Sequence, residues 1–190
     1  MRTIKENKKL IAKYPFLKPS WSEHYDYRYT WADDMPKGWW VAFGEMMCDD
    51  IKNELIKYNY LDKFEITQVK EKWGELRLYH NGVPVGCKVE KIIDKYSNLS
   101  RNICAACGKP DVPIMNWGWI YPLCEKHATN KDEYQECAEK QEPHKMTNEM
   151  KWSQYDKESE KWIDHSVDIS DTANKIRRRW EELNAVSTDG

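Results

Sequence analysis

Three cysteines and one histidine stand at the spacing of a metal-binding site. Cys104 and Cys107 are separated by two residues, and Gly108 after them lets the backbone turn so that both thiols face one point. Sixteen residues further on, Cys124 and His127 repeat this separation, which gives the pattern C-x2-C-x16-C-x2-H. Three thiolates and one imidazole complete the tetrahedron that Zn²⁺ prefers. The sequence therefore predicts a structural zinc ion with four protein ligands and no position for water.

The segment between the two ligand pairs has the pattern of a β-hairpin. Residues 112–115 and 119–123 flank a turn sequence at 116–118 that contains glycine. Cys124 is expected to open a helix that runs toward Glu139. Knuckle, hairpin and helix in this order resemble a treble-clef zinc finger. Two disulfides are the alternative use of the same residues, but two pairs of this separation in one short segment favour zinc.

The residues before the finger alternate between helical and strand periodicity. A short first helix ends at Pro15, and residues 20–37 are rich in aromatic side chains and predict a loop. Apolar residues at steps of three or four predict helices over 38–58 and 88–103. Between these helices, two alternating runs around a turn at 72–74 predict a two-stranded β-hairpin. The expected fold class is α+β, a small zinc-stabilised domain with β-hairpins and helices.

The composition changes after His127. Twenty basic and 17 acidic residues lie up to this point and ten basic and 15 acidic residues follow it, so the two parts carry formal charges of +3 and −5. We expect an N-terminal helix and aromatic loop over 1–37, an α+β domain over 38–142 that contains the finger at 104–127, and a helical extension over 143–190.

Two sets of apolar residues in this extension predict amphipathic helices. The first set has heptad-like steps and consists of Trp152, Tyr155, Ser159 and Trp162. The second follows a cap at Ser170 and Asp171 and consists of Ile169, Ala173, Ile176, Trp180 and Leu183. The two helices would fold back on each other as a helical hairpin or bind a partner, and a homo-oligomer formed through them is a further option.

Composition excludes several classes of protein. With 190 residues, 30 Lys and Arg against 32 Asp and Glu, the chain is not a strongly basic nucleic-acid coat. Its apolar runs are far shorter than a membrane span, and the N-terminus lacks the pattern of an export signal. The cysteines outside the metal pattern are an odd number, which favours a reducing compartment. We therefore expect a soluble, cytoplasmic protein.

Enzymatic readings find little support in the sequence, and we expect a non-enzymatic protein. Walker, dinucleotide-binding and nucleophile-elbow motifs are absent from it. Glu71 and Glu75 could act as paired carboxylates, but charges on the open face of a hairpin explain them equally well. An HNH-like nuclease would need a pair of histidines near the finger to activate water beside a catalytic metal, whereas His80, His144 and His165 are scattered.

Binding of a macromolecule is the remaining class. A protein partner is favoured by residues of the types that dominate interfaces, in the extension: Trp152, Tyr155, Trp162, Arg177, Arg178 and Trp180. Nucleic acid is the alternative partner, supported by Arg177-Arg178-Arg179, by Lys109 beside the knuckle and by aromatic rings that could stack on bases. The acidic balance of the extension argues against that alternative, because phosphate binding requires a basic field.

The order of motifs over residues 38–127 resembles a group of small, uncharacterised zinc-finger proteins of bacteriophages and prophages. The resemblance is carried by the Gly38-Trp39-Trp40 helix start, the hairpin over 69–77, the helix over 88–103, the Cys104/Cys107 knuckle and the Cys124/His127 pair. It implies a phage or mobile-element origin and no mechanism. On this basis the expected partner is a host or phage protein, including a host defence component that a phage would gain by blocking.

Overall fold

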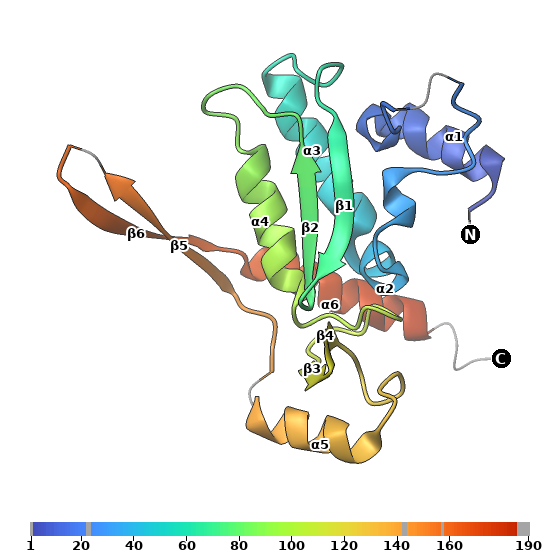
Figure 1. The fold of residues 1–190 in the computed structure, drawn as a ribbon, viewed down its shortest axis with the longest axis vertical. Coiled ribbons are helices and arrows are strands. Elements are labelled where there is room, and N and C mark those ends of the chain that lie inside the picture. The colour runs from blue at the N-terminus through green and yellow to red at the C-terminus, as the bar shows by residue number, and fades with distance from the viewer. Residues whose placement is uncertain (1, 22–23, 142–143, 157, 186–190) are drawn as a thin grey trace.

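The computed structural model describes residues 2–21, 24–141, 144–156 and 158–185 and shows an α+β fold (Figure 1). Its helices are α1 (Ile4–Lys13), α2 (Lys37–Trp39), α3 (Glu45–Lys57), α4 (Val89–Ser100), α5 (Lys131–Lys140) and α6 (Ser170–Ala185). Its strands form antiparallel pairs, namely β1 (Ile66–Lys72) with β2 (Glu75–His80), β3 (Ile114–Trp117) with β4 (Trp119–Pro122), and β5 (Glu149–Asp156) with β6 (Lys161–Asp168).

The predicted helix over 38–58 is confirmed, with one irregular stretch. A π-helical segment, Trp40–Gly44, joins α2 to α3, so that helical backbone runs from residue 37 to residue 57. The apolar stripe of this helix is buried, as its periodicity requires. Glu54 on α3 also accepts a hydrogen bond from the Lys88 amide (3.0 Å), which ties the start of α4 to α3.

The predicted β-hairpin and the helix after it are confirmed as β1–β2 and α4. Val69, Leu76 and Leu78 are buried, while the side chains that alternate with them are more exposed. On α4, Ser100 accepts a hydrogen bond from the Leu76 amide (2.9 Å), and Ser97 donates one to the Leu76 carbonyl (2.6 Å). These polar bonds fix the position of α4 against β2.

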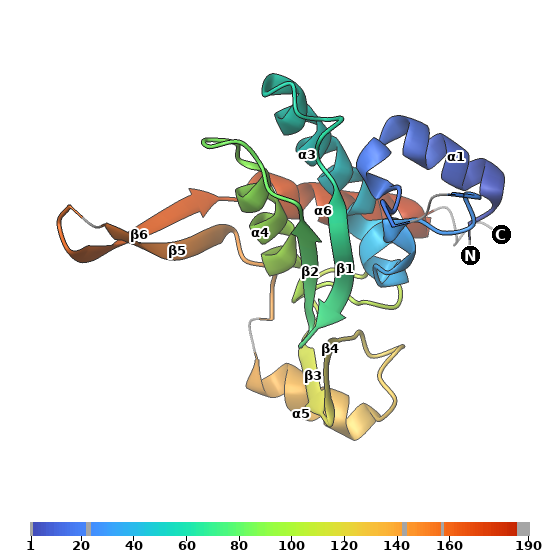
Figure 2. The same cartoon turned by 45° about the horizontal axis from the view of Figure 1, so that its top comes forward.

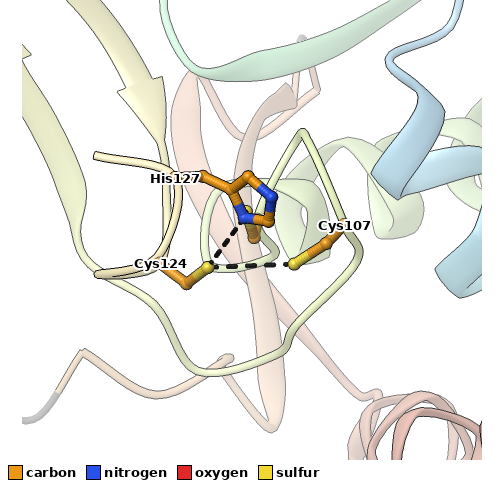
Figure 3. Close-up of side chains that lie close together, drawn as sticks. Cys107, Cys124 and His127 are labelled. Atoms are coloured by element: carbon orange, nitrogen blue, oxygen red, sulfur yellow. Dashed lines mark hydrogen bonds between the residues drawn. The ribbon is translucent and has the colours of Figure 1, made fainter. Parts of the chain in front are cut away.

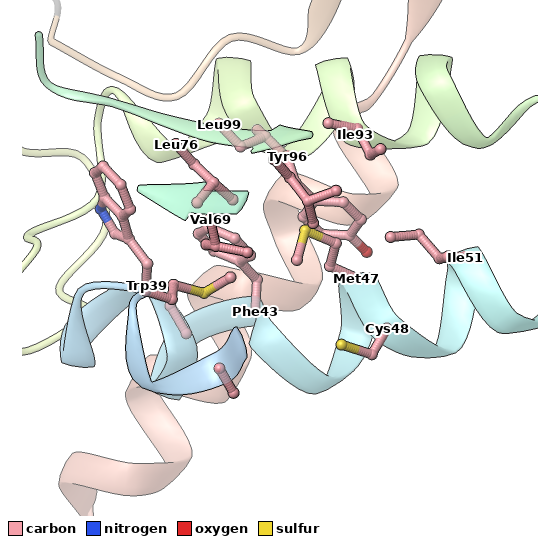
Figure 4. Packing of buried hydrophobic residues seen from close by; sticks show 14 of the residues in the cluster. Trp39, Phe43, Met47, Cys48, Ile51, Val69, Leu76, Ile93, Tyr96 and Leu99 are labelled. Atoms are coloured by element: carbon pink, nitrogen blue, oxygen red, sulfur yellow. The ribbon is translucent and has the colours of Figure 1, made fainter. Parts of the chain in front are cut away.

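One hydrophobic core joins these elements (Figure 4). Trp39 and Phe43 enter it from the N-terminal end of the long helix, and the Phe43 ring stacks on Tyr96 of α4 with the ring centroids 5.3 Å apart. The buried Trp39 indole donates to the Ile103 carbonyl (2.8 Å), immediately before the first predicted metal ligand. The core therefore extends to the edge of the finger.

The helix predicted around residues 152–162 is wrong, because this segment forms the β5–β6 hairpin. Between its strands, the Asp156 carboxylate accepts hydrogen bonds from the amides of Glu158 and Ser159, and Glu160 adopts a positive φ of 52°. This Asx turn connects the two strands of the hairpin. The alternation of apolar and polar residues in this segment fits a strand as well as a helix. Pairing between the two halves of the segment stabilises the strands.

The predicted helix after Ser170 is confirmed as α6, but it is part of the main core. Ile169, Ala173 and Ile176 are fully or almost fully buried in the same cluster as the side chains of α3 and α4. Figures 1 and 2 show α6 lying behind these helices while the β5–β6 hairpin projects away from the body. The expected pair of helices packed on each other does not form.

Among the described residues, no helix has both the length and the apolar content to span a membrane.

Candidate metal centre

The four predicted ligands converge on one point. The side-chain donor atoms of Cys104, Cys107, Cys124 and His127 all lie within 4.8 Å of one another. Figure 3 shows the sulfur atoms of Cys107 and Cys124 pointing toward the His127 ring from separate loops. The two pairs stand on either side of the β3–β4 hairpin in the chain, so the hairpin brings them together.

Two of the distances between donor atoms match those expected around a tetrahedral ion. Two thiolates bound at about 2.3 Å to one tetrahedral metal lie about 3.8 Å apart, and a thiolate and an imidazole nitrogen lie about 3.5 Å apart. The Sγ atoms of Cys107 and Cys124 are 3.8 Å apart, and Cys104 Sγ is 3.7 Å from His127 Nδ1. Cys124 Sγ and His127 Nδ1 are closer, at 3.1 Å. The group could thus hold a metal ion with all four positions filled by protein.

The backbone of the knuckle explains the spacing of the first pair. The Gly108 amide donates to the Cys104 carbonyl (2.8 Å) and the Cys104 amide donates to the Lys109 carbonyl (2.8 Å). Gly108 has a φ of 87°, a conformation that side-chain-bearing residues rarely adopt, which accounts for glycine at this position. The knuckle predicted from sequence is formed as expected.

The second pair differs from the prediction. Cys124 does not open a helix, because residues 124–127 form a turn in which the His127 amide donates to the Cys124 carbonyl (2.8 Å). Helix α5 begins only at Lys131, where the Asn130 side chain caps the amides of Asp132 and Glu133. The cap residue decides the helix start, and a treble-clef arrangement is not established by this geometry.

Burial and mutual repulsion separate the three cysteines by acidity. Burial opposes ionisation of Cys104, but backbone amides, including those of Cys124 and Cys107, hold its pKa below the ordinary value. Burial raises the pKa of Cys107 to about 12, and burial together with the Cys104 charge raises the pKa of Cys124. Cys104 is therefore the thiol that ionises most readily, and metal binding is coupled to the loss of thiol protons.

The knuckle packs directly against the start of the long helix. The Gly38 amide donates to the Ala105 carbonyl (2.8 Å), and a Cβ placed on Gly38 would lie 2.2 Å from the Cys104 carbonyl oxygen and 2.5 Å from the Gly108 nitrogen. Only glycine allows this approach. The sequence marks Gly38 as a helix start but does not show this contact. The available signal was a glycine within a helix, where glycine is unfavourable unless close packing requires it.

An ion pair joins the knuckle to the last helix. Arg177 on α6 donates through Nε to Asp111 Oδ2 (2.8 Å) and through Nη2 to Asp111 Oδ1 (2.9 Å). Asp111 also accepts from the Met146 amide (2.8 Å). Asp111 follows the knuckle sequence directly and was missed in the sequence, because its partner lies 66 positions away.

The predicted interaction residues are spread over two elements. Arg177 is occupied by Asp111, Arg178 is exposed on α6, and Trp180 is half-buried there. On the hairpin, Trp152 is half-buried beside the core, and its ring stacks on His165 with the centroids 5.2 Å apart. Trp162 is 70% exposed on the strand opposite. The side chain of Tyr155 lies outside the described part of the structure.

The residues weighed for catalysis have structural partners. Glu71 accepts from the Gly74 amide (2.6 Å), and Glu75 accepts from Arg77 and Arg101 (3.2 Å each). His80 ends β2 and His165 lies on β6, so the two rings belong to different sheets.

No protein-family model, no curated protein and no solved structure matched the chain in comparisons with known proteins.

Proposed function

We propose that the chain is a non-enzymatic binding protein, stabilised by one structural zinc ion, that engages a protein partner through its β5–β6 hairpin. We call residues 149–168 the arm. The observation that carries the proposal is the arm itself, a two-stranded ribbon that projects from the body (Figures 1 and 2). Ribbons of two strands are marginally stable in water and gain order when a partner covers them.

The arm has a buried root and an exposed distal part. Met150 is buried in the main core, and the Lys91 ammonium lies 4.9 Å from the centroid of the Trp152 ring. Further out, Trp162 and Ile163 are 70 and 42% exposed. The root fixes the direction of the arm, and the distal part offers apolar side chains of the kind that anchor interfaces.

The charge of the arm favours a protein over nucleic acid. It carries three lysines against six carboxylates, which are Glu149, Asp156, Glu158, Glu160, Asp164 and Asp168. Phosphate groups would be repelled by this excess. A protein surface with basic groups around an apolar patch is the complementary partner, and the resemblance to phage zinc-finger proteins supports a host or phage protein in this role.

Zinc is the metal that this donor set supports. Three thiolates and one imidazole in a tetrahedron are soft to intermediate ligands, and four protein ligands leave no site for water. In this role the ion cross-links the knuckle to the turn at 124–127 and takes no part in chemistry. Metal analysis of purified protein should find one zinc per chain, and a content well below one would contradict the assignment.

The arm can be shortened without disturbing its root. Ser153 lies opposite Asp164, so replacing residues 154–163 with Asn-Gly leaves a two-residue turn between these positions and keeps Met150 and Trp152. The full chain, the shortened variant and a Trp21→Ser control would be used as baits in a host lysate. Trp21 is 68% exposed and lies outside the arm.

The proposal expects a stoichiometric protein that the full chain and the control recover and the shortened variant does not. Equal recovery by all three baits, with the shortened variant folded, would contradict a role for the arm. Light scattering on the full chain separates a foreign partner from self-association, because a dimer that the shortened variant loses would make a second copy the partner.

A further inference from the structure

The outward face of the β1–β2 hairpin is basic and is distinct from the arm. On β1, Lys70 and Lys72 lie on the face opposite to that of buried Val69, and Lys70 stands directly opposite Arg77 on β2. The Glu75 carboxylate is shared between Arg77 and Arg101, each at 3.2 Å. Two arginines thus share one carboxylate, while Lys70 and Lys72 add two positive charges that no other described carboxylate on this face offsets, on a chain whose net charge is −2.

Two aromatic rings accompany these cations. Tyr79 is 45% exposed, with the Lys70 ammonium 5.1 Å from its ring centroid. Trp73, at the tip of the hairpin, is 66% exposed, with the Lys72 ammonium 4.6 Å from its ring centroid. Neither ring belongs to the buried core.

Trp73 occupies a backbone position that disfavours it. Trp73 and Gly74 have φ values of 56° and 76°, the pattern of a hairpin turn in which Asn-Gly is the preferred pair. A tryptophan here accepts backbone strain and leaves an apolar ring in water, so it contributes little to folding. Strain held at an exposed side chain points to a role in binding.

The tip is held firmly in place. The Glu71 carboxylate binds the Gly74 amide (2.6 Å), and a Cβ on Gly74 would lie 3.3 Å from the Ile120 side chain. The turn therefore rests on the β3–β4 hairpin of the finger, on which Trp119 is 83% exposed. The metal-stabilised finger thus supports the turn that presents Trp73.

We infer that this surface, formed by Lys70, Lys72, Trp73, Arg77 and Tyr79, binds single-stranded nucleic acid. Aromatic rings that stack on unpaired bases, beside cations that contact phosphates, are the general means of such recognition. The nucleic-acid strand follows β1 and the tip, because the neighbouring pocket on the α4 side has an excess of carboxylates. Glu75, Glu90 and Asp94 line it against two lysines, Lys91 and Lys151. The chain would then join a protein partner on the arm to nucleic acid on the sheet.

The test is binding of fluorescein-labelled oligo(U) and oligo(dT) to the full-length, zinc-loaded protein, followed by anisotropy. Trp73→Asn suits the turn and is expected to keep or raise the melting temperature while weakening binding about 5- to 150-fold, the loss of one base-stacking contact. Trp21→Asn removes a ring of similar exposure elsewhere and should bind like the unmodified chain. Lys72→Gln should weaken binding and flatten its dependence on salt between about 50 and 200 mM.

Several results would overturn the inference. One is absence of oligonucleotide binding at low salt by the unmodified protein, and another is equal affinity of Trp73→Asn and the unmodified chain. Affinity that does not change with salt would exclude phosphate contacts. A protein recovered from lysate by the full chain and lost with Trp73→Asn, without oligonucleotide binding, would assign the surface to a protein instead. A Glu90→Gln/Asp94→Asn double variant should bind the oligonucleotide at least as tightly as the unmodified chain. Weaker binding would contradict the proposed path of the nucleic acid along β1.

Discussion

Gly38 is the residue at which the long helix and the metal knuckle come closest. Gly38→Ala would drive a methyl group into the Cys104 carbonyl oxygen and the Gly108 nitrogen, and backbone atoms cannot move aside as side chains do. We expect a loss of at least about 3 kcal/mol in the free energy of unfolding. Gly82→Ala is the matched control, because Gly82 has a positive φ of 104° but open space around it. It should cost about 1–2 kcal/mol. Chemical denaturation of both variants measures the difference, and equal losses would show that the close approach is unimportant.

Cys104 is the most deeply buried of the predicted metal ligands. Replacing it with serine removes the thiolate that the knuckle amides stabilise. The affinity for zinc should fall by more than about 100-fold, because loss of a ligand costs more than loss of a residue that only hydrogen-bonds to a ligand. Competition with a chromophoric chelator gives the affinity. Cys87→Ser, at a half-buried cysteine outside the site, is the control and should retain its metal. If the control variant also lost its zinc, the assignment of the four ligands would be contradicted.

At the scale of elements, the Arg177–Asp111 pair attaches α6 to the finger. Both side chains are about three-quarters buried, and their two hydrogen bonds are charge-assisted. Arg177→Gln should therefore cost about 1.5–3 kcal/mol at neutral pH. Arg178→Gln, at an exposed neighbour on the same helix, should stay within about 0.5 kcal/mol. Urea titrations compare the two, and similar losses would mean that α6 docks through its apolar face alone.

The same pair predicts a dependence on pH. Burial tends to raise the pKa of Asp111, but the bonds from Arg177 and the Met146 amide lower it below its ordinary value. A carboxyl whose folded pKa is lowered stabilises the fold above its unfolded pKa of about 3.9 and loses that contribution as the pH falls through the folded value. The stability gap between the unmodified chain and Arg177→Gln should thus be constant from about pH 5 to 8 and shrink below about pH 4. A gap that persists in acid would contradict an ionic origin.

At the scale of the whole molecule, the candidate metal site contacts both the start of the long helix and the last helix. The knuckle contacts the start of the long helix through the Gly38 amide and contacts α6 through Asp111. Removal of the proposed zinc ion with a chelator should therefore increase hydrogen exchange in residues 37–44 and in α6, together with the finger, while α3 and α4 retain their protection. Exchange confined to residues 104–127 would show that the finger folds independently of the body.

Interactions between residues close in the sequence determined the ligand pairs and most of the helices and strands. The ligand pairs could be read from the sequence because a knuckle is built from neighbouring residues and needs glycine at one place. The long helix, the β1–β2 hairpin, α4 and α6 were predicted for the same reason, since each apolar pattern reports the face that the element buries. The α+β class follows from these elements.

Long-range contacts decided the rest. Trp152 and Trp162 have a spacing that suits a helix, and only cross-strand pairing with residues of the opposite run made them strands. The start of α5 was set by the Asn130 cap in place of Cys124. From the sequence alone, Arg177 is a surface cation and Gly38 a helix start. Only the fold brings Asp111 beside Arg177 and packs the knuckle on Gly38. A sequence records what each residue can do within a few positions, whereas partners far along the chain are chosen only when the core forms.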